Sequence, residues 1–437
     1  MPNQEPRDGS PNKHRKAGEE RRSQGVPLPG RAALFLFCCT VLVGCGLGIR
    51  RLYRLSMAEK LFAEDSPEAV RAAIAYSPGN AEYHVRLASF LGAEGLDEIA
   101  AAVRLNPGEA MWWIEYAVLQ EIAGDNPQAE QSLLRAAQVS RYYLPRMMLA
   151  SYYFRHRDIP KFRDWARKAM SIGSMRPTLV LQMAFQLGIP PAQITGELTP
   201  DRVPALEALL EELIRAAEPG DSKSAGDAAD QIQPCAARLA AAGSADDAPA
   251  ILRAAERLFD LGRIEQSTSL WNSLADRNWI LRPRLPQTAA SSFRFEWNDL
   301  RAFDWRLLPS EGVLIEEAST GGLRVTLSGR QAERCRILDR RLPLLPNTAY
   351  RITARSGGDP VDPEAGLVWR IATAGRVQLE FPAVAPNGQT SGRIETGPVP
   401  QPYVLELVYD RPQGKTRLSA TIEFESVTAE PLPKIHD

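Results

Sequence analysis

Residues 111–140 read MWWIEYAVLQEIAGDNPQAEQSLLRAAQVS, and this stretch decides how the middle of the chain folds. Apolar side chains recur three or four residues apart on both sides of a short turn, which is typical of two amphipathic helices. Ala129, Leu133 and Ala136 follow Ala117 by 12, 16 and 19 residues. Small residues let antiparallel helices approach closely, and larger ones fill the groove of the next helix pair. The stretch therefore predicts a helical hairpin that stacks with others.

The same pattern recurs along the chain. The segments YHVRLASFL, MWWIEYAVL, LPRMMLASYYF and PTLVLQMAF align on Ala88, Ala117, Ala150 and Ala184, at intervals of 29, 33 and 34 residues. Together with Trp113 and Tyr116, these alanines resemble the tetratricopeptide repeat family, whose period is 34 residues. The resemblance covers residues 58–190 and implies an α-solenoid. Solenoids of this kind bind peptides or other proteins, so we expect a protein partner on it.

Further helical patterns extend the predicted solenoid to residues 56–280. Residues 199–219 are helical, and residues 246–277 predict one more helix pair with Gly262 at its turn. Between them lies GDSKSAGDAADQIQPCAARLAAAGSADDAP, whose first dozen residues we expect to form a loop and whose CAARLAAAG part a short helix.

Before the solenoid, residues 32–49 read AALFLFCCTVLVGCGLGI without a charge or a proline. Eighteen helical residues span about 27 Å, close to the hydrocarbon thickness of a bilayer. This favours one transmembrane helix. Leu42-Val43-Gly44-Cys45 also resembles a bacterial lipobox, so a lipidated Cys45 is the second interpretation. A cleaved signal peptide comes last, because arginines follow the run and no small-residue cleavage motif does.

Charges around residues 32–49 predict the orientation. Residues 12–31 carry six Lys or Arg and residues 50–69 carry four. The bias favours a cytoplasmic N-terminus and a C-terminal body outside the cytoplasm, in a bacterial inner membrane. Residues 1–31 are charged and rich in Pro and Gly, and they predict a disordered cytoplasmic tail.

From residue 283 to 437 the apolar residues alternate with period two, which predicts β-strands. Alternation predicts that one face of each strand is buried, as for Leu323, Val325 and Leu327. Val377, Leu379 and Phe381 are likewise expected to form the buried face of a strand. Strands at this spacing over about 150 residues indicate an antiparallel β-sandwich. The fold class is thus multidomain α plus β.

The segments FDWRLLPSEGVLIEEASTGGLRVTLSG, LDRRLPLLPNTAYRITARS and LVYDRPQGKTRLSATIEFESVTAEPL resemble jelly-roll carbohydrate-binding modules. The resemblance implies polysaccharide binding through exposed aromatic side chains, for which Trp297 and Trp305 are the candidates. Burial of the neighbouring aromatic residues in the core is the alternative, and the same sandwich also serves as a plain structural domain.

Composition and motifs exclude several classes. The net charge of −1 argues against nucleic acid as a partner. Four histidines and two cysteines outside the apolar stretch show no metal-ligand spacing, and no nucleophile or phosphate-binding motif occurs, so we predict no catalytic residue, metal or cofactor. The sequence predicts a non-enzymatic, membrane-anchored scaffold of the bacterial cell envelope, with exopolysaccharide or envelope assembly as its setting. A carbohydrate-active envelope protein is the alternative.

Overall fold

The computed structural model describes residues 28–172, 177–218, 222–285, 289–292, 301–318 and 321–433. The predicted tail up to residue 27 and Trp297 lie outside these residues. The chain divides into two compact units, Met1–Asp125 and Asn126–Asp437, and each is described by itself.

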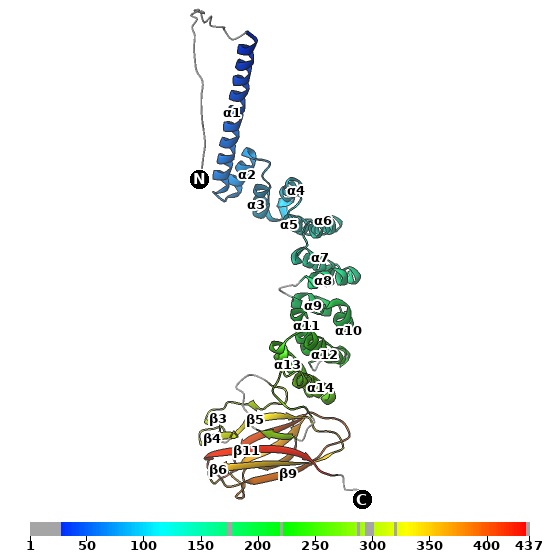
Figure 1. The fold of residues 1–437 in the computed structure, drawn as a ribbon, viewed down its shortest axis with the longest axis vertical. Coiled ribbons are helices and arrows are strands. Elements are labelled where there is room, and N and C mark those ends of the chain that lie inside the picture. Colours follow the sequence, from blue (N-terminus) through cyan, green and yellow to red (C-terminus); the bar gives the residue numbers. More distant parts are fainter. Residues whose placement is uncertain are drawn as a thin grey trace, which may run out of the picture. The chain divides into compact units, whose positions relative to one another are not determined.

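The first unit is helical. Its helices are α1 (Leu28–Phe62), α2 (Pro67–Tyr76), α3 (Ala81–Leu91), a 3-10 turn η1 (Gly92–Gly95), α4 (Leu96–Leu105) and α5 (Ala110–Ile122). Side-chain caps start three of them: Ser66, Asn80 and Glu109 accept from the amides of Ala69, Glu82 and Met111, respectively. Consecutive helices pack on each other from α1 to α5 (Figure 1).

Helix α1 is longer than the predicted span. It runs from Leu28 to Phe62 and so extends beyond residues 32–49 at both ends. Its part Ala33–Phe62 is long and apolar enough to cross a membrane, with a mean hydropathy of 2.0 over its most apolar window. A signal sequence near an N-terminus has the same properties.

The last turns of α1 already belong to the solenoid. Ala58 is fully buried there, in a cluster with Val70 and Ala73 of α2 and Tyr83 and Leu87 of α3. The first repeat therefore uses the C-terminal end of the apolar helix as its first helix, and no linker separates the two.

The second unit begins with helices and ends with a sandwich. The helices are α6 (Asn126–Val139), α7 (Tyr143–Arg155), α8 (Ile159–Ser171), α9 (Pro177–Gln186), α10 (Pro191–Gln193), a π-helical turn η2 (Ile194–Leu198), α11 (Val203–Ala216), α12 (Ser222–Ala242), a 3-10 turn η3 (Ala245–Asp247), α13 (Ala248–Asp260) and α14 (Ile264–Asp276). They pack as successive pairs such as α7–α8, α11–α12 and α13–α14 (Figure 1).

The alanines on which the repeats were aligned all lie inside. Ala88, Ala117, Ala150 and Ala184 are at most 5% exposed. Gly262 has φ of 76° and forms the predicted turn between α13 and α14. The helical region is thus a tetratricopeptide-like solenoid, as the spacing predicted.

The expected loop and short helix around residue 230 were wrong. Residues Ser222–Ala242 form the single helix α12, which contains Pro234. A proline interrupts the helical hydrogen bonds, but the helix is held by burial on α11. The buried stripe includes Ile232, Cys235 and Leu239 at helical spacing, so tertiary packing outweighs local propensity here.

Two antiparallel sheets form the C-terminal sandwich. The strands are β1 (Ala289–Ser292), β2 (Arg306–Leu307), β3 (Val313–Glu317), β4 (Leu323–Ser328), β5 (Arg334–Leu342), β6 (Ala349–Gly358), β7 (Leu367–Thr373), β8 (Arg376–Pro382), β9 (Gln389–Glu395), β10 (Tyr403–Asp410) and β11 (Ser419–Pro431). One sheet has the order β3-β4-β11-β6-β9, with β1 also paired to β11, and the other has β2-β5-β10-β7-β8. This confirms the predicted antiparallel sandwich.

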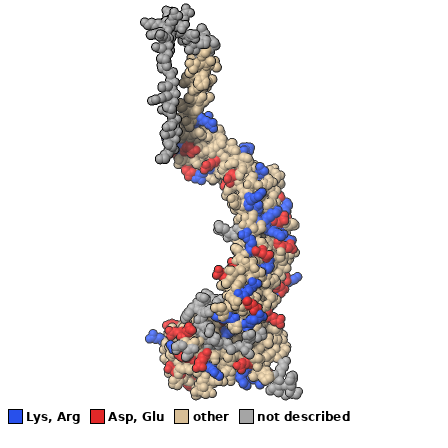
Figure 2. Space-filling view, in the orientation of Figure 1, with Lys and Arg blue, Asp and Glu red and all other residues tan. Residues whose placement is uncertain are grey.

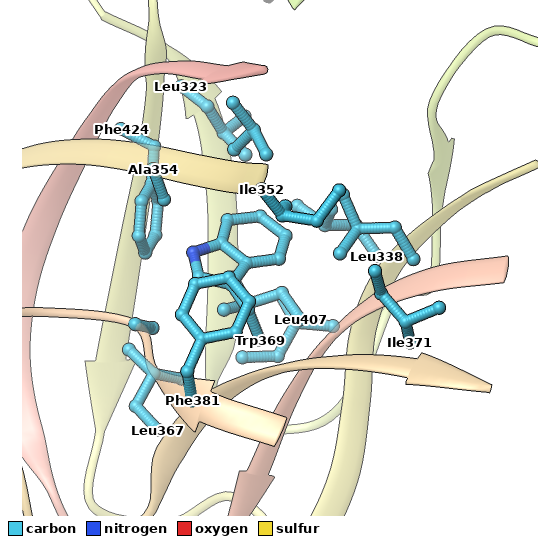
Figure 3. Packing of buried hydrophobic residues seen from close by; sticks show 14 of the residues in the cluster. Leu323, Leu338, Ile352, Ala354, Leu367, Trp369, Ile371, Phe381, Leu407 and Phe424 are labelled. Carbon is cyan, nitrogen blue, oxygen red and sulfur yellow. The ribbon is translucent and has the colours of Figure 1, made fainter. Parts of the chain in front are cut away.

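Trp369 on β7 lies in the core between the sheets (Figure 3). It is fully buried, and its ring meets that of Phe424 edge-on at a centroid distance of 5.4 Å. The expected alternation fails only at Val377, which is 49% exposed. The pairing of β7 with β8 shifts between Ile371 and Ala372, and such a bulge turns the following side chain to the other face.

The sandwich is joined to the last helix pair by buried contacts. Phe303 is 1% exposed and its ring lies edge-on to Phe259 of α13 and Trp271 of α14, at 5.6 and 5.4 Å. The Ala302 amide donates to Glu256 of α13 at 2.6 Å. These contacts make the sandwich and the end of the solenoid one packed structure.

Candidate functional site: a groove in the first helical repeats

The first unit contains an open groove of about 500 Å³. It lies between the end of α1, α3, α4 and α5, and its walls are Phe62, Glu82, Val85, Arg86, Ala88, Ser89, Gly92, Ile99, Ile114, Glu115, Val118 and Leu119. Most of the surface that lines it is apolar. A hollow of this size accepts a few side chains of another molecule, and apolar walls reward apolar side chains.

Tight local packing shapes the groove. A Cβ atom on Gly95 would lie 2.6 Å from the Ala88 carbonyl oxygen, so only glycine allows η1 to approach α3 this closely. This close turn is where the repeat interval shortens to 29 residues between Ala88 and Ala117. Gly92 of the same turn η1 lines the groove next to α3.

The end of α1 is fastened to α3 beside the groove. The Tyr83 hydroxyl donates to the Glu59 carboxylate at 2.6 Å, and the ring of Phe62 lies 4.8 Å from that of Tyr83. Burial, reinforced by Glu59, raises the pKa of Tyr83 to about 12. The phenol therefore stays protonated and keeps donating at physiological pH, which fixes Phe62 as a wall of the groove.

Three charged side chains line the groove, and they are not equivalent. Arg86 is compensated, because its guanidinium donates to both carboxylate oxygens of Asp65 at 2.7 and 2.6 Å. That ion pair lowers the pKa of Asp65. Glu115 makes no hydrogen bond or ion pair with any residue that the structure describes, and desolvation raises its pKa. The groove therefore presents an uncompensated carboxylate beside apolar walls.

Apart from Ala88, the residues of the groove are not indicated by the repeat spacing or by any sequence motif. A signal was nevertheless present, because the same positions of two repeats contribute. Val85 and Ile114 each lie three residues before the aligned alanine, and Ser89 and Val118 each follow it by one. Alignment gives the register, but only the structure shows which positions stay open between the helices.

The structure places the predicted glycan residue Trp305 against the core. It is half-buried, its ring lies 6.0 Å from that of Trp369, and the guanidinium carbon of Arg340 lies 5.6 Å from the ring centroid. Trp297 falls among residues outside the described ranges, so the two are not brought together. The alternative lipidation residue Cys45 is exposed on α1, seventeen residues before its end at Phe62.

Aromatic side chains of the sandwich are otherwise internal. Within residues 301–318 and 321–433, the seven aromatic residues besides Trp305 are all buried. They are Phe303, Tyr350, Trp369, Phe381, Tyr403, Tyr409 and Phe424. These ranges therefore offer no exposed ring on which a sugar could stack.

The outer face of the five-stranded sheet carries ion pairs. One residue from each strand stands in register across it, namely Arg306, Asp339, Glu406, Arg370 and Glu380. Arg306 donates to both oxygens of Asp339 at 3.0 and 2.5 Å, and Arg370 donates to Glu380 at 2.8 Å. The adjacent acids are bridged by Arg336, which donates to Glu406 at 2.7 Å. This face is charged and internally compensated.

Within the described ranges, no group of three or more His, Cys, Asp or Glu side chains is placed to hold a metal ion. Cys235 is fully buried, and burial raises the pKa of its thiol to about 12, so it is an inert core residue.

No family model matches the chain, and no curated protein matches it. Solved structures are similar over about half of it. The C-terminal part of a TPR repeat-containing protein from Cytophaga hutchinsonii is 12% identical, over 52% of this chain and 94% of that chain, with a TM-score of 0.30. YrrB, a TPR protein with an unusual peptide-binding site, is 12% identical over 48% and 93%, with a TM-score of 0.26.

The structure of Naa15/Naa10 bound to HypK-THB is 16% identical over 52% of this chain, with a TM-score of 0.28. This chain spans 37% of that one. At such identities and TM-scores the likenesses carry no argument about function, and the helix pairs themselves define the repeat architecture.

Proposed function

We propose that this protein is a membrane-anchored, non-enzymatic scaffold of the bacterial cell envelope. Helix α1 would anchor it in the inner membrane, with the N-terminus cytoplasmic and the body outside. The solenoid groove would bind a protein partner, in a setting such as exopolysaccharide or envelope assembly. The observation that carries the proposal is the apolar groove of about 500 Å³ at the base of α1.

Placement of the groove supports an adaptor that works close to a membrane. Phe62, the last residue of α1, is one of its walls. An apolar groove on a helix stack is suited to an extended or helical segment of another protein. A partner held there would be positioned next to the anchor.

A crosslinking experiment tests the proposal. A photoreactive amino acid in place of Val118, inside the groove, should give a discrete protein adduct in cells, and Asp97→photoreactive amino acid on the exposed side of α4 should not. Val118→Lys should abolish an adduct formed from Ser89, whereas Leu105→Lys, a matched exposed apolar position outside the groove, should leave it intact. An adduct equally strong from position 97, or one insensitive to Val118→Lys, would contradict a specific groove partner.

The sandwich would contact a polysaccharide or another subunit. The compensated outer face of the five-stranded sheet and the internal aromatic residues support the subunit contact. The alternative function, a carbohydrate-active envelope protein, depends on Trp297 and Trp305.

Binding of bacterial polysaccharides to the full chain in detergent tests this alternative, with Trp297→Ala and Trp305→Ala beside it. The full chain is required because Phe303 packs on α13 and α14. Trp305→Phe is the control, since it retains the contact with Trp369. Saturable binding lost in either alanine variant and kept in the phenylalanine variant would favour the carbohydrate-active protein.

A further inference from the structure

Residues 141–172, which contain α7 and α8, form the most basic part of the solenoid, and we name them the basic hairpin. They carry eight Lys or Arg against two Asp, a net charge of +6 in a chain whose net charge is −1. Figure 2 shows Lys and Arg gathered over the middle of the helical region. A local excess of this size creates a field that attracts anionic groups.

Part of this charge is compensated within the second unit. Lys161 pairs with Glu130 at 2.9 Å, Arg163 pairs with Glu197, and Lys168 lies 3.4 Å from Asp164. These pairs account for three of the eight basic side chains.

Other arginines are not compensated. The guanidinium groups of Arg141, Arg157 and Arg167 make no hydrogen bond or ion pair with any residue that the structure describes, and Arg146 donates only to the Tyr142 carbonyl, at 2.8 Å. Arg141, Arg157 and Arg167 are also exposed. They remain available to an anionic partner.

Three of these arginines gather at one end of the hairpin. Helices α7 and α8 pack as an antiparallel pair, so the start of α7 lies beside the end of α8. Arg141 and Arg146 lie at the start of α7, and Arg167 lies close to the end of α8, so all three are at the same end of the hairpin. A hollow of about 250 Å³ opens beside Arg167 between α8 and η2, and Asp164 and Glu197 also line it.

Exposed apolar side chains accompany the arginines. Tyr142 is 81% exposed, Leu144 40% and Ile172 38%. Arg and Tyr with aliphatic neighbours are typical of protein interfaces, where the arginines pair with carboxylates and the apolar groups are buried. Aliphatic side chains such as Leu144 and Ile172 contribute little to an anionic glycan or to a phosphate backbone.

We infer that the basic hairpin docks an acidic segment of a second protein, in addition to the partner of the groove. Carboxylates of that segment pair with Arg141, Arg146 and Arg167. Its apolar side chains cover Tyr142.

A second copy of this chain is a poorer occupant. Residues 56–125 carry twelve Asp or Glu against four Lys or Arg, a net charge of −8. Two copies anchored side by side by α1 would place acidic repeats against acidic repeats, and like charges repel. Copies anchored in the same orientation would likewise place one basic hairpin against the other, so we assign the acidic segment to a different protein, and the crosslink distinguishes it from a second copy.

The experiment uses the full chain in cells, with a benzoylphenylalanine crosslinker in place of Tyr142. We expect one protein adduct whose crosslinked segment, mapped by mass spectrometry, contains more Asp and Glu than Lys and Arg. Arg141→Glu/Arg146→Glu/Arg167→Glu should reduce the adduct at least tenfold. The matched control Arg71→Glu/Arg104→Glu/Arg253→Glu makes the same change in net charge elsewhere on the solenoid and should leave the adduct unchanged.

A second readout does not depend on the folding of the variants. The wild-type adduct formed in isolated membranes should weaken as NaCl is raised from 50 to 500 mM, because exposed ion pairs are screened. Four results would overturn the inference: no adduct, an adduct with a glycan or nucleic acid, an adduct with a second copy, or equal loss in the control. The groove adduct from position 118 is scored separately, so failure here leaves the proposed function standing.

Discussion

Arg341 of β5 and Asp260 of α13 form a two-pronged ion pair across the junction of the sandwich and the solenoid. The guanidinium donates from Nε and Nη2 to the two carboxylate oxygens, at 3.0 Å each. Its Nη1 also lies 3.4 Å from Glu256, which itself accepts from the Ala302 amide. The side chains of Arg341 and Glu256 are only 18% and 15% exposed, so this pair is screened less than a surface pair.

We expect Arg341→Ala to destabilise the second unit by about 1–3 kcal/mol, because it leaves a half-buried carboxylate without its cation. Arg393→Ala is the matched control. Arg393 pairs with Glu395 on the exposed surface, where loss of the pair costs about 0–1 kcal/mol. Calorimetric unfolding of the full chain measures both, and equal midpoints for the two variants would argue against the junction.

Trp369→Ala should cost about 3–5 kcal/mol, because it leaves a large cavity between the sheets. Trp369→Phe should cost clearly less. The indole Nε1 is buried and has no hydrogen-bond partner among the described residues, and the substitution removes that unpaired N–H along with part of the ring. Denaturant unfolding followed by far-UV circular dichroism compares the two, and similar losses would show that the nitrogen is in fact bonded.

Ala150→Leu should destabilise the solenoid by about 1–3 kcal/mol, because a fully buried alanine between packed helices leaves no room for extra methylene groups. Ala237→Leu on the exposed side of α12 should change stability by less than about 0.5 kcal/mol. Thermal unfolding of both variants provides the test. An unchanged melting temperature of Ala150→Leu would mean that the repeats are loosely packed.

Glu115 should make the first unit lose stability as pH rises. Desolvation raises its pKa in the folded state above the ordinary value of 4.5, so its favourable contribution is complete below that value and disappears as pH rises through the folded pKa. The stability difference between wild type and Glu115→Gln should therefore widen from pH 4 towards pH 7, with the variant the more stable. A difference that is constant with pH would show that Glu115 is solvated like an ordinary surface glutamate.

The anchor makes a fifth prediction. If α1 spans the bilayer as proposed, Cys45→Ser leaves the protein in the membrane fraction after carbonate extraction, with its electrophoretic mobility unchanged. Release of the variant would instead support the lipid anchor on Cys45.

Periodicity predicted the parts of the fold in which side-chain pattern and burial agree. The alanine spacing located the helix pairs, and the alternation from Leu323 to Phe424 located the strands. Prediction failed at α12, where packing on α11 retains a helix through Pro234. It also failed at Val377, where a bulge reverses the alternation, because a bulge depends on the partner strand and leaves no mark on the local pattern.

The candidate sites were less accessible to sequence reasoning. The groove is bordered by η1, whose close packing on Ala88 is a tertiary contact that the repeat spacing does not contain. Glu115 is uncompensated because no charged side chain of another described helix pairs with it, and this too depends on the folded structure. For Trp305 the sequence position suggested an exposed ring, whereas the structure places the ring against Trp369 of the core. Sequence position alone does not reveal that contact.

The continuity of α1 has a mechanical consequence. An α-helix is stiff, and Phe62 lies about 18 Å along the axis from residue 50. If the apolar part is held in a bilayer, a tilt or rotation of that part would move Phe62 in the groove wall as well, because α1 is one continuous helix from Leu28 to Phe62. A force applied to the groove by a bound partner would be transmitted through α1 in the other direction. Binding at the groove and the orientation of the anchor in the bilayer would then depend on each other.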